Sequence, residues 1–287
     1  MGNVVIVGAG PAGISAALYT VRAGIPTKVI AMGHGALEKA EKVENYYGFP
    51  EPVTGPQLIE NGIAQAERLG VELVFDEVVG LGFGSGSSMV VKTAMGEHEA
   101  DSIVLATGAS RKTPSIDGLE RFEGSGVSHC AVCDAFFYRG KDVAVLGCSE
   151  YAVSEAKELL PIVNSVTLLT NGDAPTASIP AEVRVITEKV EAFVGGKTLE
   201  QVVFSDGNTL NVAGVFIAVG VAGSTDLARK MGIITEGQAI AVDKAMATNI
   251  PGIFAAGDCA GGMFQIAKAV YQGAVAGTEV VKYIRGL

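Results

Sequence analysis

The chain has 287 residues, a length that favours two domains. Its formal net charge of −10 argues against nucleic acid as a partner, and no basic run favours binding to a membrane surface. No apolar stretch reaches the ~18 residues of a membrane span. No charged leader precedes the first expected strand, so we expect a cytoplasmic protein.

The N-terminal segment has the pattern of a dinucleotide-binding turn. A buried strand is expected over residues 3–7 and a helix over 14–23, and between them stand Gly8, Gly10, Pro11, Ala12 and Gly13. In such a Gly-x-Gly-x-x-Gly turn the first glycine permits a tight bend, the second lets the backbone approach a pyrophosphate, and the third lets helix and strand pack closely. The phosphates are expected at the helix N-terminus. The alternative is a glycine turn that binds nothing.

Strand and helix patterns continue to residue 108. The second strand, 27–31, ends in Ala31-Met32-Gly33, without the acidic residue that usually binds a dinucleotide ribose. A small sheet is expected over 71–79, 89–93 and 97–100, and a buried strand from Ser102 ends in Ala106-Thr107-Gly108. Between these strands lie a polar-aromatic loop over 43–50 and a helix over 54–69.

Two cysteines at the spacing Cys-x-x-Cys are followed at once by an acid. Cys130 and Cys133 can close a small disulfide ring, and this spacing lowers a thiol pKa, which favours the thiolate that attacks disulfides. Asp134 adds a carboxylate that can donate or accept a proton. The same spacing occurs in zinc sites, but about four ligands are needed and no other Cys or His pair accompanies these two. The segment therefore favours a redox dithiol, and we expect no metal.

The strand–glycine turn–helix pattern then occurs a second time. A strand over 141–146 leads into a turn over 147–152, a helix over 153–160 and a strand over 165–169. Residues 215–220 repeat the pattern of 103–108. We interpret this as the duplication of a dinucleotide-binding fold, with one copy inserted into the other.

The C-terminal segment completes the first copy. A strand from Ile250 ends in Gly257-Asp258, and a mostly apolar helix is expected over 262–285. Asp258 stands where a carboxylate can hydrogen-bond a sugar-like chain, although a helix cap is the alternative. Cys148 and Cys259 are expected to be buried as small hydrophobic residues.

Together these motifs resemble the low-molecular-weight thioredoxin reductases, in the same order along nearly the whole chain. The resemblance implies an α/β protein with two nested Rossmann-like domains of the three-layer ββα type. Residues 1–111 and 239–287 would bind FAD, and 112–238 would form an inserted central domain with the dithiol. It further implies a homodimer that reduces thioredoxin, with Cys133 against the flavin, Cys130 as the exchanging thiol and Asp134 as the acid–base residue. FAD would be held by Gly8, Gly10, Pro11, Ala12, Gly13, Asn45, Thr107, Gly108, Gly257 and Asp258.

The central domain departs from the family pattern for NADPH. Ser149 replaces the second glycine, Glu150 adds a negative charge, and residues 170–175 contain no arginine or lysine to hold a 2′-phosphate. This is similar to the ferredoxin-dependent flavin thioredoxin reductases, which lack the pyridine-nucleotide site. We therefore expect reduced ferredoxin as the electron donor.

Three alternatives stay open at this point. The first is an NAD(P)H-dependent reductase with a degenerate motif. The second is a flavin-dependent dithiol oxidase that uses oxygen, and the third is a non-catalytic flavin redox sensor. Ferredoxins are usually acidic, so docking needs a basic patch; the candidates are Lys39, Lys42, Arg111, Lys112, Arg139 and Lys141.

Overall fold

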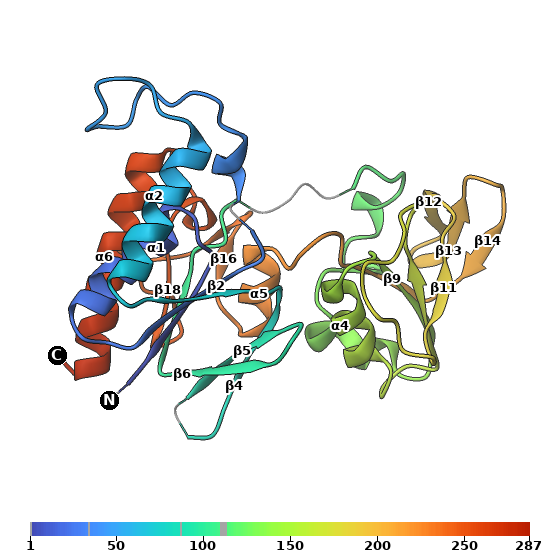
Figure 1. Ribbon diagram of the computed structural model, residues 1–287. Helices are drawn as coiled ribbons and strands as arrows, with labels where there is room; N and C mark the ends of the chain where they lie inside the picture. The colour runs from blue at the N-terminus through green and yellow to red at the C-terminus, as the bar shows by residue number, and fades with distance from the viewer. Residues whose placement is uncertain (1, 34, 87, 110–113) are drawn as a thin grey trace. The chain divides into compact units, whose positions relative to one another are not determined.

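The structure, a computed structural model, describes residues 2–33, 35–86, 88–109 and 114–287 (Figure 1). The chain divides into two compact units. The terminal unit comprises Met1–Arg111 and Gly223–Leu287, and the central unit comprises Lys112–Ala222. The expected boundary at 111/112 and the basic candidates Arg111 and Lys112 lie outside the described residues.

The terminal unit is built on a parallel sheet of five strands in the order β18-β7-β1-β2-β3. All neighbouring strands pair in parallel, as expected for short, buried runs of valine and isoleucine. The strands are β1 (Val4–Val7), β2 (Thr27–Ala31), β3 (Glu72–Phe75), β7 (Ser102–Leu105) and β18 (Ile253–Ala255).

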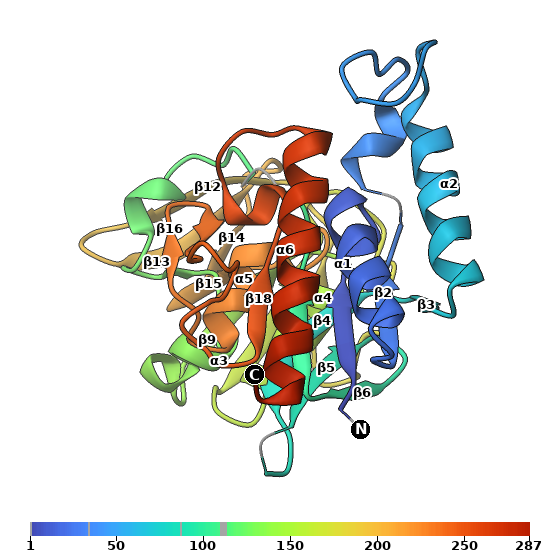
Figure 2. The same ribbon diagram turned by 90° about the vertical axis from the view of Figure 1, so that its left-hand side faces the viewer.

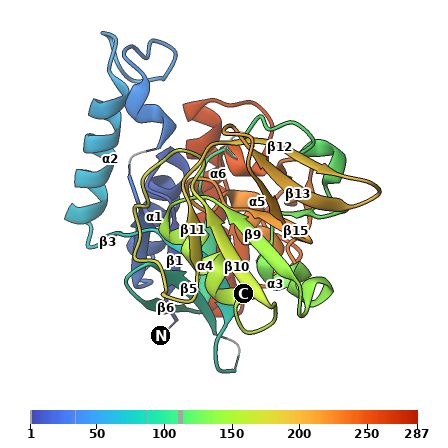
Figure 3. The ribbon, with the colours of Figure 1, turned by 90° about the vertical axis from the view of Figure 1, so that its right-hand side faces the viewer.

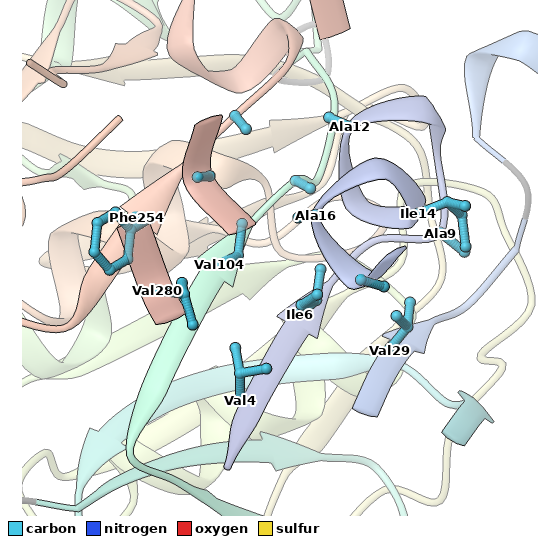
Figure 4. Close-up of a cluster of buried hydrophobic side chains, with 14 of the residues drawn as sticks. Val4, Ile6, Ala9, Ala12, Ile14, Ala16, Val29, Val104, Phe254 and Val280 are labelled. Carbon is cyan, nitrogen blue, oxygen red and sulfur yellow. The ribbon is translucent and has the colours of Figure 1, made fainter. Parts of the chain in front are cut away.

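Helices α1 (Pro11–Arg22) and α6 (Ile266–Arg285) lie side by side on this sheet (Figure 2). Their close approach depends on small residues: a Cβ on Gly273 would lie 2.1 Å from the Ala12 carbonyl oxygen. Between the helices and the sheet lies a hydrophobic core that includes Ile6, Val104 and Val280 (Figure 4). Helix α6 begins at Ile266 rather than at 262, after the turn formed by η4 (Asp258–Ala260).

The remaining elements of the terminal unit surround this framework. Sequence analysis predicted that residues 71–79 belong to a small sheet, but they contribute to two different strands. β3 joins the parallel sheet and β4 joins the antiparallel one, and between them Asp76 Oδ1 accepts the Glu77 amide. The other elements are η1 (Ala36–Lys39), α2 (Gly55–Arg68), β4 (Val78–Phe83), β5 (Met89–Thr93), β6 (Glu97–Ala100), α5 (Ser224–Lys230), β16 (Thr235–Glu236) and β17 (Ala239–Ile240).

The central unit repeats this plan with a parallel sheet in the order β11-β10-β9-β15-β8 (Figure 3). A three-stranded antiparallel sheet, β12-β13-β14, accompanies it. The strands are β8 (Val127–Ser128), β9 (Asp142–Leu146), β10 (Ser165–Leu169), β11 (Arg184–Ile186), β12 (Val190–Gly195), β13 (Leu199–Phe204), β14 (Thr209–Asn211) and β15 (Gly214–Ile217). The helices are η2 (Glu120–Phe122), α3 (Ala131–Asp134), η3 (Ala135–Tyr138) and α4 (Glu150–Leu159).

The equivalence of the two sheets confirms the predicted pair of nested Rossmann-like folds. In both sheets, the strand before the glycine turn is central. The edge strand beside β7 is β18, which follows the central unit in the chain, and the edge strand beside β15 is β8, which precedes β9. Residues 223–238, which sequence analysis assigned to the central domain, instead belong to the terminal unit because α5 packs on β4 and β17. Among the described residues, no helix is long and apolar enough to span a membrane.

Candidate functional site

The turn between β1 and α1 is tight at its ends and open in its middle. Gly8 has φ +113°, and a Cβ on it would lie 2.3 Å from the Ala106 carbonyl oxygen. A Cβ on Gly13 would lie 1.8 Å from the Gly8 carbonyl oxygen. Around Gly10, the N-cap of α1, a Cβ would meet nothing within 4 Å, and no side chain caps the helix. No side chain in the described structure therefore caps the first amides of α1.

Three strand ends meet beside this turn, at the carboxyl edge of the terminal sheet. β1, β7 and β18 are neighbours, so Gly8, Thr107 and Gly257 follow adjacent strands. A Cβ on Gly257 would lie 2.9 Å from the Ala12 Cβ. The Thr107 hydroxyl is buried and has no hydrogen-bond partner in the described structure. Ligands of parallel α/β sheets bind at this edge, and an orphan hydroxyl there is a group that a ligand would satisfy.

Helix α6 adds groups to this edge that sequence analysis missed. The Lys268 ammonium, 14% exposed, donates to the carbonyl oxygens of Gly257 at 3.0 Å and Gly261 at 2.7 Å. It lies 3.6 Å from Asp258 Oδ1. Gln265 Oε1 accepts from Asn45 at 3.0 Å, which brings that predicted residue to the same helix end. A lysine in the first turn of a mostly apolar helix, ten residues after Asp258, was the available signal.

The two free cysteines differ in burial. Cys259 is fully buried, with its sulfur 3.2 Å from the carbonyl oxygens of Leu105 and Ala256, and burial raises the pKa of its thiol to about 11. Cys148 is only half-buried, contrary to the expectation from sequence. Burial, followed by the carboxylate of Asp173, raises the pKa of the Cys148 thiol.

Cys130 and Cys133 form a disulfide in the central unit, with their Cα atoms 5.3 Å apart. Their environments differ. Cys133 is exposed, whereas Cys130 is 3% exposed and acts as the N-cap of α3. The Cys133 amide donates to Cys130 Sγ over 3.2 Å. After reduction, a Cys130 thiolate would keep this amide as a hydrogen-bond donor.

Ser128, at the end of β8, connects the acid to the dithiol. Its hydroxyl donates to Asp134 Oδ2 over 2.7 Å and accepts the Cys130 amide at 3.1 Å. The Asp134 amide also donates to the Cys130 carbonyl at 3.2 Å. Burial, and then the Asp134 carboxylate, raise the pKa of Tyr138.

Helix α4 packs against α3, which carries the dithiol. Glu155, 1% exposed, accepts the Ala131 amide at 2.8 Å. Ala131 is the first residue of α3, so this bond joins the dithiol to the helix that follows the second glycine turn. Among the described residues, no group of three or more His, Cys, Asp or Glu could hold a metal ion.

The turn between β9 and α4 is closed on both sides. Gly147 keeps the tight bend, since a Cβ there would lie 2.1 Å from the Ala218 carbonyl oxygen. The Ser149 hydroxyl, however, donates to the Gly220 carbonyl oxygen. From the other side, the Thr176 amide and hydroxyl donate to the Cys148 carbonyl oxygen at 2.8 and 3.1 Å. The segment after β10 therefore folds back over the turn.

Comparison with known proteins places this architecture in a family. The sequence model of the pyridine nucleotide-disulphide oxidoreductases matches residues 2–273. A thioredoxin reductase of Aquifex aeolicus is 34% identical over 302 residues, covering 99% of this chain and 94% of its own length.

Two solved structures are similar over the whole chain. The atypical thioredoxin reductase TRi from Desulfovibrio vulgaris Hildenborough is 43% identical with a TM-score of 0.94, covering 100% of this chain and 99% of that one. A ferredoxin-flavin thioredoxin reductase from Clostridium acetobutylicum is 28% identical with a TM-score of 0.75 and the same coverage. The chain therefore belongs to the pyridine nucleotide-disulphide oxidoreductase family and, within it, to the thioredoxin reductases, which are FAD-binding flavoproteins.

Proposed function

We propose that this flavoprotein passes electrons from reduced ferredoxin, through FAD and the Cys130–Cys133 pair, to the disulfide of thioredoxin. The observation that carries the choice of donor is the closed turn between β9 and α4. The reduction of thioredoxin is supported by the disulfide itself and by the relatives named above. A homodimer and a cytoplasmic location stay predictions from the resemblance.

The terminal unit fits FAD. The open N-terminus of α1 at Gly10 to Ala12 suits a pyrophosphate. The buried Thr107 hydroxyl and the Asp258 carboxylate are placed to bind the sugar-like part, with Gly8, Gly13, Gly108, Gly257 and Asn45 shaping the site. When bound, FAD supplies a carrier that accepts electrons singly or in pairs and delivers a pair to a disulfide.

The dithiol then carries the pair by thiol–disulfide exchange. Cys133 is the more exposed cysteine of the pair, and we assign to it the entry of electrons. Cys130, stabilised as a thiolate by the Cys133 amide, attacks the disulfide of thioredoxin once it becomes accessible. Asp134, held by Ser128, exchanges protons with the reacting thiols.

The central unit opposes NADPH with both shape and charge. Ser149 places a side chain where the backbone should meet a pyrophosphate, and its hydroxyl is already bound to Gly220. The segment over the turn is anchored by Thr176 and by Asn171, whose Oδ1 accepts the Val190 amide at 2.8 Å. It carries Asp173 close enough to Cys148 to perturb its pKa, and Glu150 adds a second negative charge.

The energetic consequence is large. A charge-assisted hydrogen bond contributes about 1.5–3 kcal/mol, so the loss of two would weaken pyridine-nucleotide binding by roughly a hundredfold or more. Of the basic residues considered for ferredoxin docking, Lys39 and Lys42 lie in the terminal unit and Arg139 and Lys141 in the central unit. Lys42 is already paired with Glu44 at 2.9 Å, and Arg139 lies over the Phe136 ring.

One alternative has a specific observation in its favour. The Thr170 hydroxyl at the end of β10 is buried without a hydrogen-bond partner in the described structure, as a ligand-binding group would be. An NAD(P)H reductase with a shifted turn is therefore the second candidate.

Anaerobic stopped-flow mixing decides between the donors. The oxidised enzyme is mixed with NADPH, NADH or reduced ferredoxin, and bleaching of the flavin is followed. We expect ferredoxin to bleach it at least about a hundredfold faster than either nucleotide. Rapid, saturable bleaching by micromolar nucleotide would overturn the ferredoxin assignment. Turnover of thioredoxin with ferredoxin excludes the non-catalytic sensor, and slow consumption of oxygen with excess dithiol excludes the oxidase.

A matched pair of variants extends this test. Ser149→Gly alone should leave NADPH inactive, because Thr176 still closes the turn from the other side. Ser205→Ala, in an exposed turn of the same unit, serves as the control. Cys130→Ser and Cys133→Ser should each abolish reduction of thioredoxin, whichever donor is used.

A further inference from the structure

Ser128 is the second residue of a two-residue strand, β8, that pairs with β15 through Val127–Val215 and Ser128–Phe216. It is 5% exposed and stands two residues before Cys130. This strand pairing fixes the backbone of Ser128, so its hydroxyl is held in one place beside the dithiol. A hydroxyl carries one hydrogen and can also accept hydrogen bonds.

The geometry assigns that hydrogen. Ser128 Oγ lies 2.7 Å from Asp134 Oδ2 and 3.4 Å from the Cys130 carbonyl oxygen. The shorter contact is to a carboxylate, and hydrogen bonds to charged acceptors are the shorter and stronger ones. The hydroxyl therefore donates to Asp134 and uses a lone pair to accept the Cys130 amide at 3.1 Å.

We propose that Ser128 is a positioning residue that holds the Asp134 carboxylate beside Cys130 for proton transfer during thiol–disulfide exchange. The proposal rests on the proposed function, in which Asp134 is the acid–base residue of the dithiol. No residue between 128 and 134 other than the two cysteines carries a side chain that could replace this link, except His129, which bonds Glu123 at 3.0 Å instead.

The exchange balances as follows. The Cys130 thiol gives its proton to the Asp134 carboxylate, and the Cys130 thiolate attacks one sulfur of the substrate disulfide. The other substrate sulfur leaves with the bonding pair and takes that proton from Asp134. Cys133 then returns its proton to Asp134 as its sulfur attacks Cys130 Sγ. The Cys130–Cys133 bond re-forms, and the second substrate sulfur leaves with the bonding pair and takes this proton from Asp134. Two electrons pass from the dithiol to the substrate, and Asp134 ends as it began.

This role predicts a dependence on the leaving thiol. A dialkyl disulfide releases a basic thiolate that needs a proton, whereas an aromatic disulfide such as 5,5′-dithiobis(2-nitrobenzoate) releases a weakly basic thiolate that leaves without one. A side chain that only supported the fold would affect both substrates alike. The comparison of the two disulfides therefore separates positioning from structure.

The test uses the full-length flavoprotein with its dithiol reduced, mixed with bis(2-hydroxyethyl) disulfide or with the aromatic disulfide and quenched by alkylation for mass spectrometry. Ser128→Ala should slow exchange with the dialkyl disulfide about tenfold and flatten its pH profile, because part of the general-acid contribution is lost. Exchange with the aromatic disulfide should change less than about twofold. Ser128→Thr, which keeps the hydroxyl, and Ser205→Ala should behave as the wild type for both substrates.

Asp134→Asn should reproduce the selectivity of Ser128→Ala, and it keeps the test decisive if the alanine variant folds poorly. Equal slowing of both disulfides by Ser128→Ala, or no slowing of either, would overturn the proposal. If the wild type does not reduce thioredoxin while the dialkyl selectivity persists, the proposed function fails and the positioning role stands.

Discussion

The turn between β1 and α1 and the turn between β9 and α4 occupy equivalent places in two sheets with the same strand order. Both begin with a glycine at which an added Cβ would clash with a carbonyl oxygen at the end of the neighbouring strand. That oxygen belongs to Ala106 for Gly8 and to Ala218 for Gly147. They differ at the second position. Gly10 leaves open space, whereas the Ser149 side chain bonds across to Gly220.

The surroundings of the two turns differ in the same sense. Beside the first turn stand the buried Thr107 hydroxyl and the Lys268 ammonium. Beside the second, Val219 occupies the place of Thr107 in the repeated pattern, and the Thr176 hydroxyl donates to the Cys148 carbonyl oxygen. The first position preserves the fold in both copies. Under the proposed function, the second position and the adjoining loop decide whether a ligand can enter.

The largest effect is expected from filling the first turn. Gly13→Ala places a Cβ 1.8 Å from the Gly8 carbonyl oxygen and should cost at least about 3 kcal/mol in the free energy of unfolding, with loss of FAD. A Cβ at Gly10 meets no atom within 4 Å, so Gly10→Val should cost only about 1 kcal/mol while still excluding FAD. Urea unfolding and the visible spectrum of the purified proteins report the two effects. A stable Gly10→Val protein that retains its flavin would contradict the assigned pyrophosphate position.

The next largest effect concerns Lys268, which lies beside the open turn. Lys268→Met removes two charge-assisted hydrogen bonds to Gly257 and Gly261 and leaves Asp258 without its nearby cation. We expect the dissociation constant of FAD to rise roughly thirty- to a hundredfold, with a partial recovery in Lys268→Arg. Titration of the apoprotein with FAD by flavin fluorescence measures it. Unchanged affinity in the methionine variant would show that this edge of the sheet does not contact FAD.

A smaller effect is expected from substituting Thr107 by valine, the residue type at the corresponding position 219. Thr107→Val removes a buried hydroxyl that lacks a partner, so the apoprotein should become more stable by about 1 kcal/mol. The affinity for FAD should fall about tenfold, since one hydrogen bond is lost. Opposite signs for stability and affinity are the signature of a ligand-binding group. A loss of stability without a loss of affinity would instead indicate a structural hydroxyl.

The last comparison, which has no effect at neutral pH, concerns the cysteines near the two turns. The ordinary thiol pKa of 9.0 rises to about 11 for Cys259 in the folded protein, so the folded state holds this proton more tightly than the unfolded state. Stability from this group is complete below pH 9 and is lost as the pH rises toward 11, by about 1.4 kcal/mol per unit. Cys259→Ala should remove that slope in urea unfolding measured across this range. Cys148→Ala, at a half-buried site, should remove less of it; an equal change in both would contradict the difference in burial.

Much of this organisation could be predicted from particular residues. The repeat of a strand, a glycine turn and a helix at Gly8 and at Gly147 predicted two nested folds, because a strand feeding a helix through such a turn allows few alternatives. The same reasoning did not find the sheet of β12, β13 and β14, whose strands alternate only weakly between apolar and polar residues. It also did not predict that β3 and β4, on either side of Asp76, join different sheets. Nor did it place residues 223–238, because the packing of α5 on β4 involves partners about 150 residues apart.

The sequence by itself determined the chemistry that the chain carries: a dithiol next to an acid, one intact glycine motif and one in which serine replaces glycine. These are local facts, since covalent spacing and the absence of a side chain act without any distant partner. Only the tertiary structure decided which groups serve that chemistry. Ser128 reaches Asp134, Glu155 reaches Ala131, and Lys268 reaches Gly257, because strand pairing and helix packing bring together atoms that no spacing rule relates.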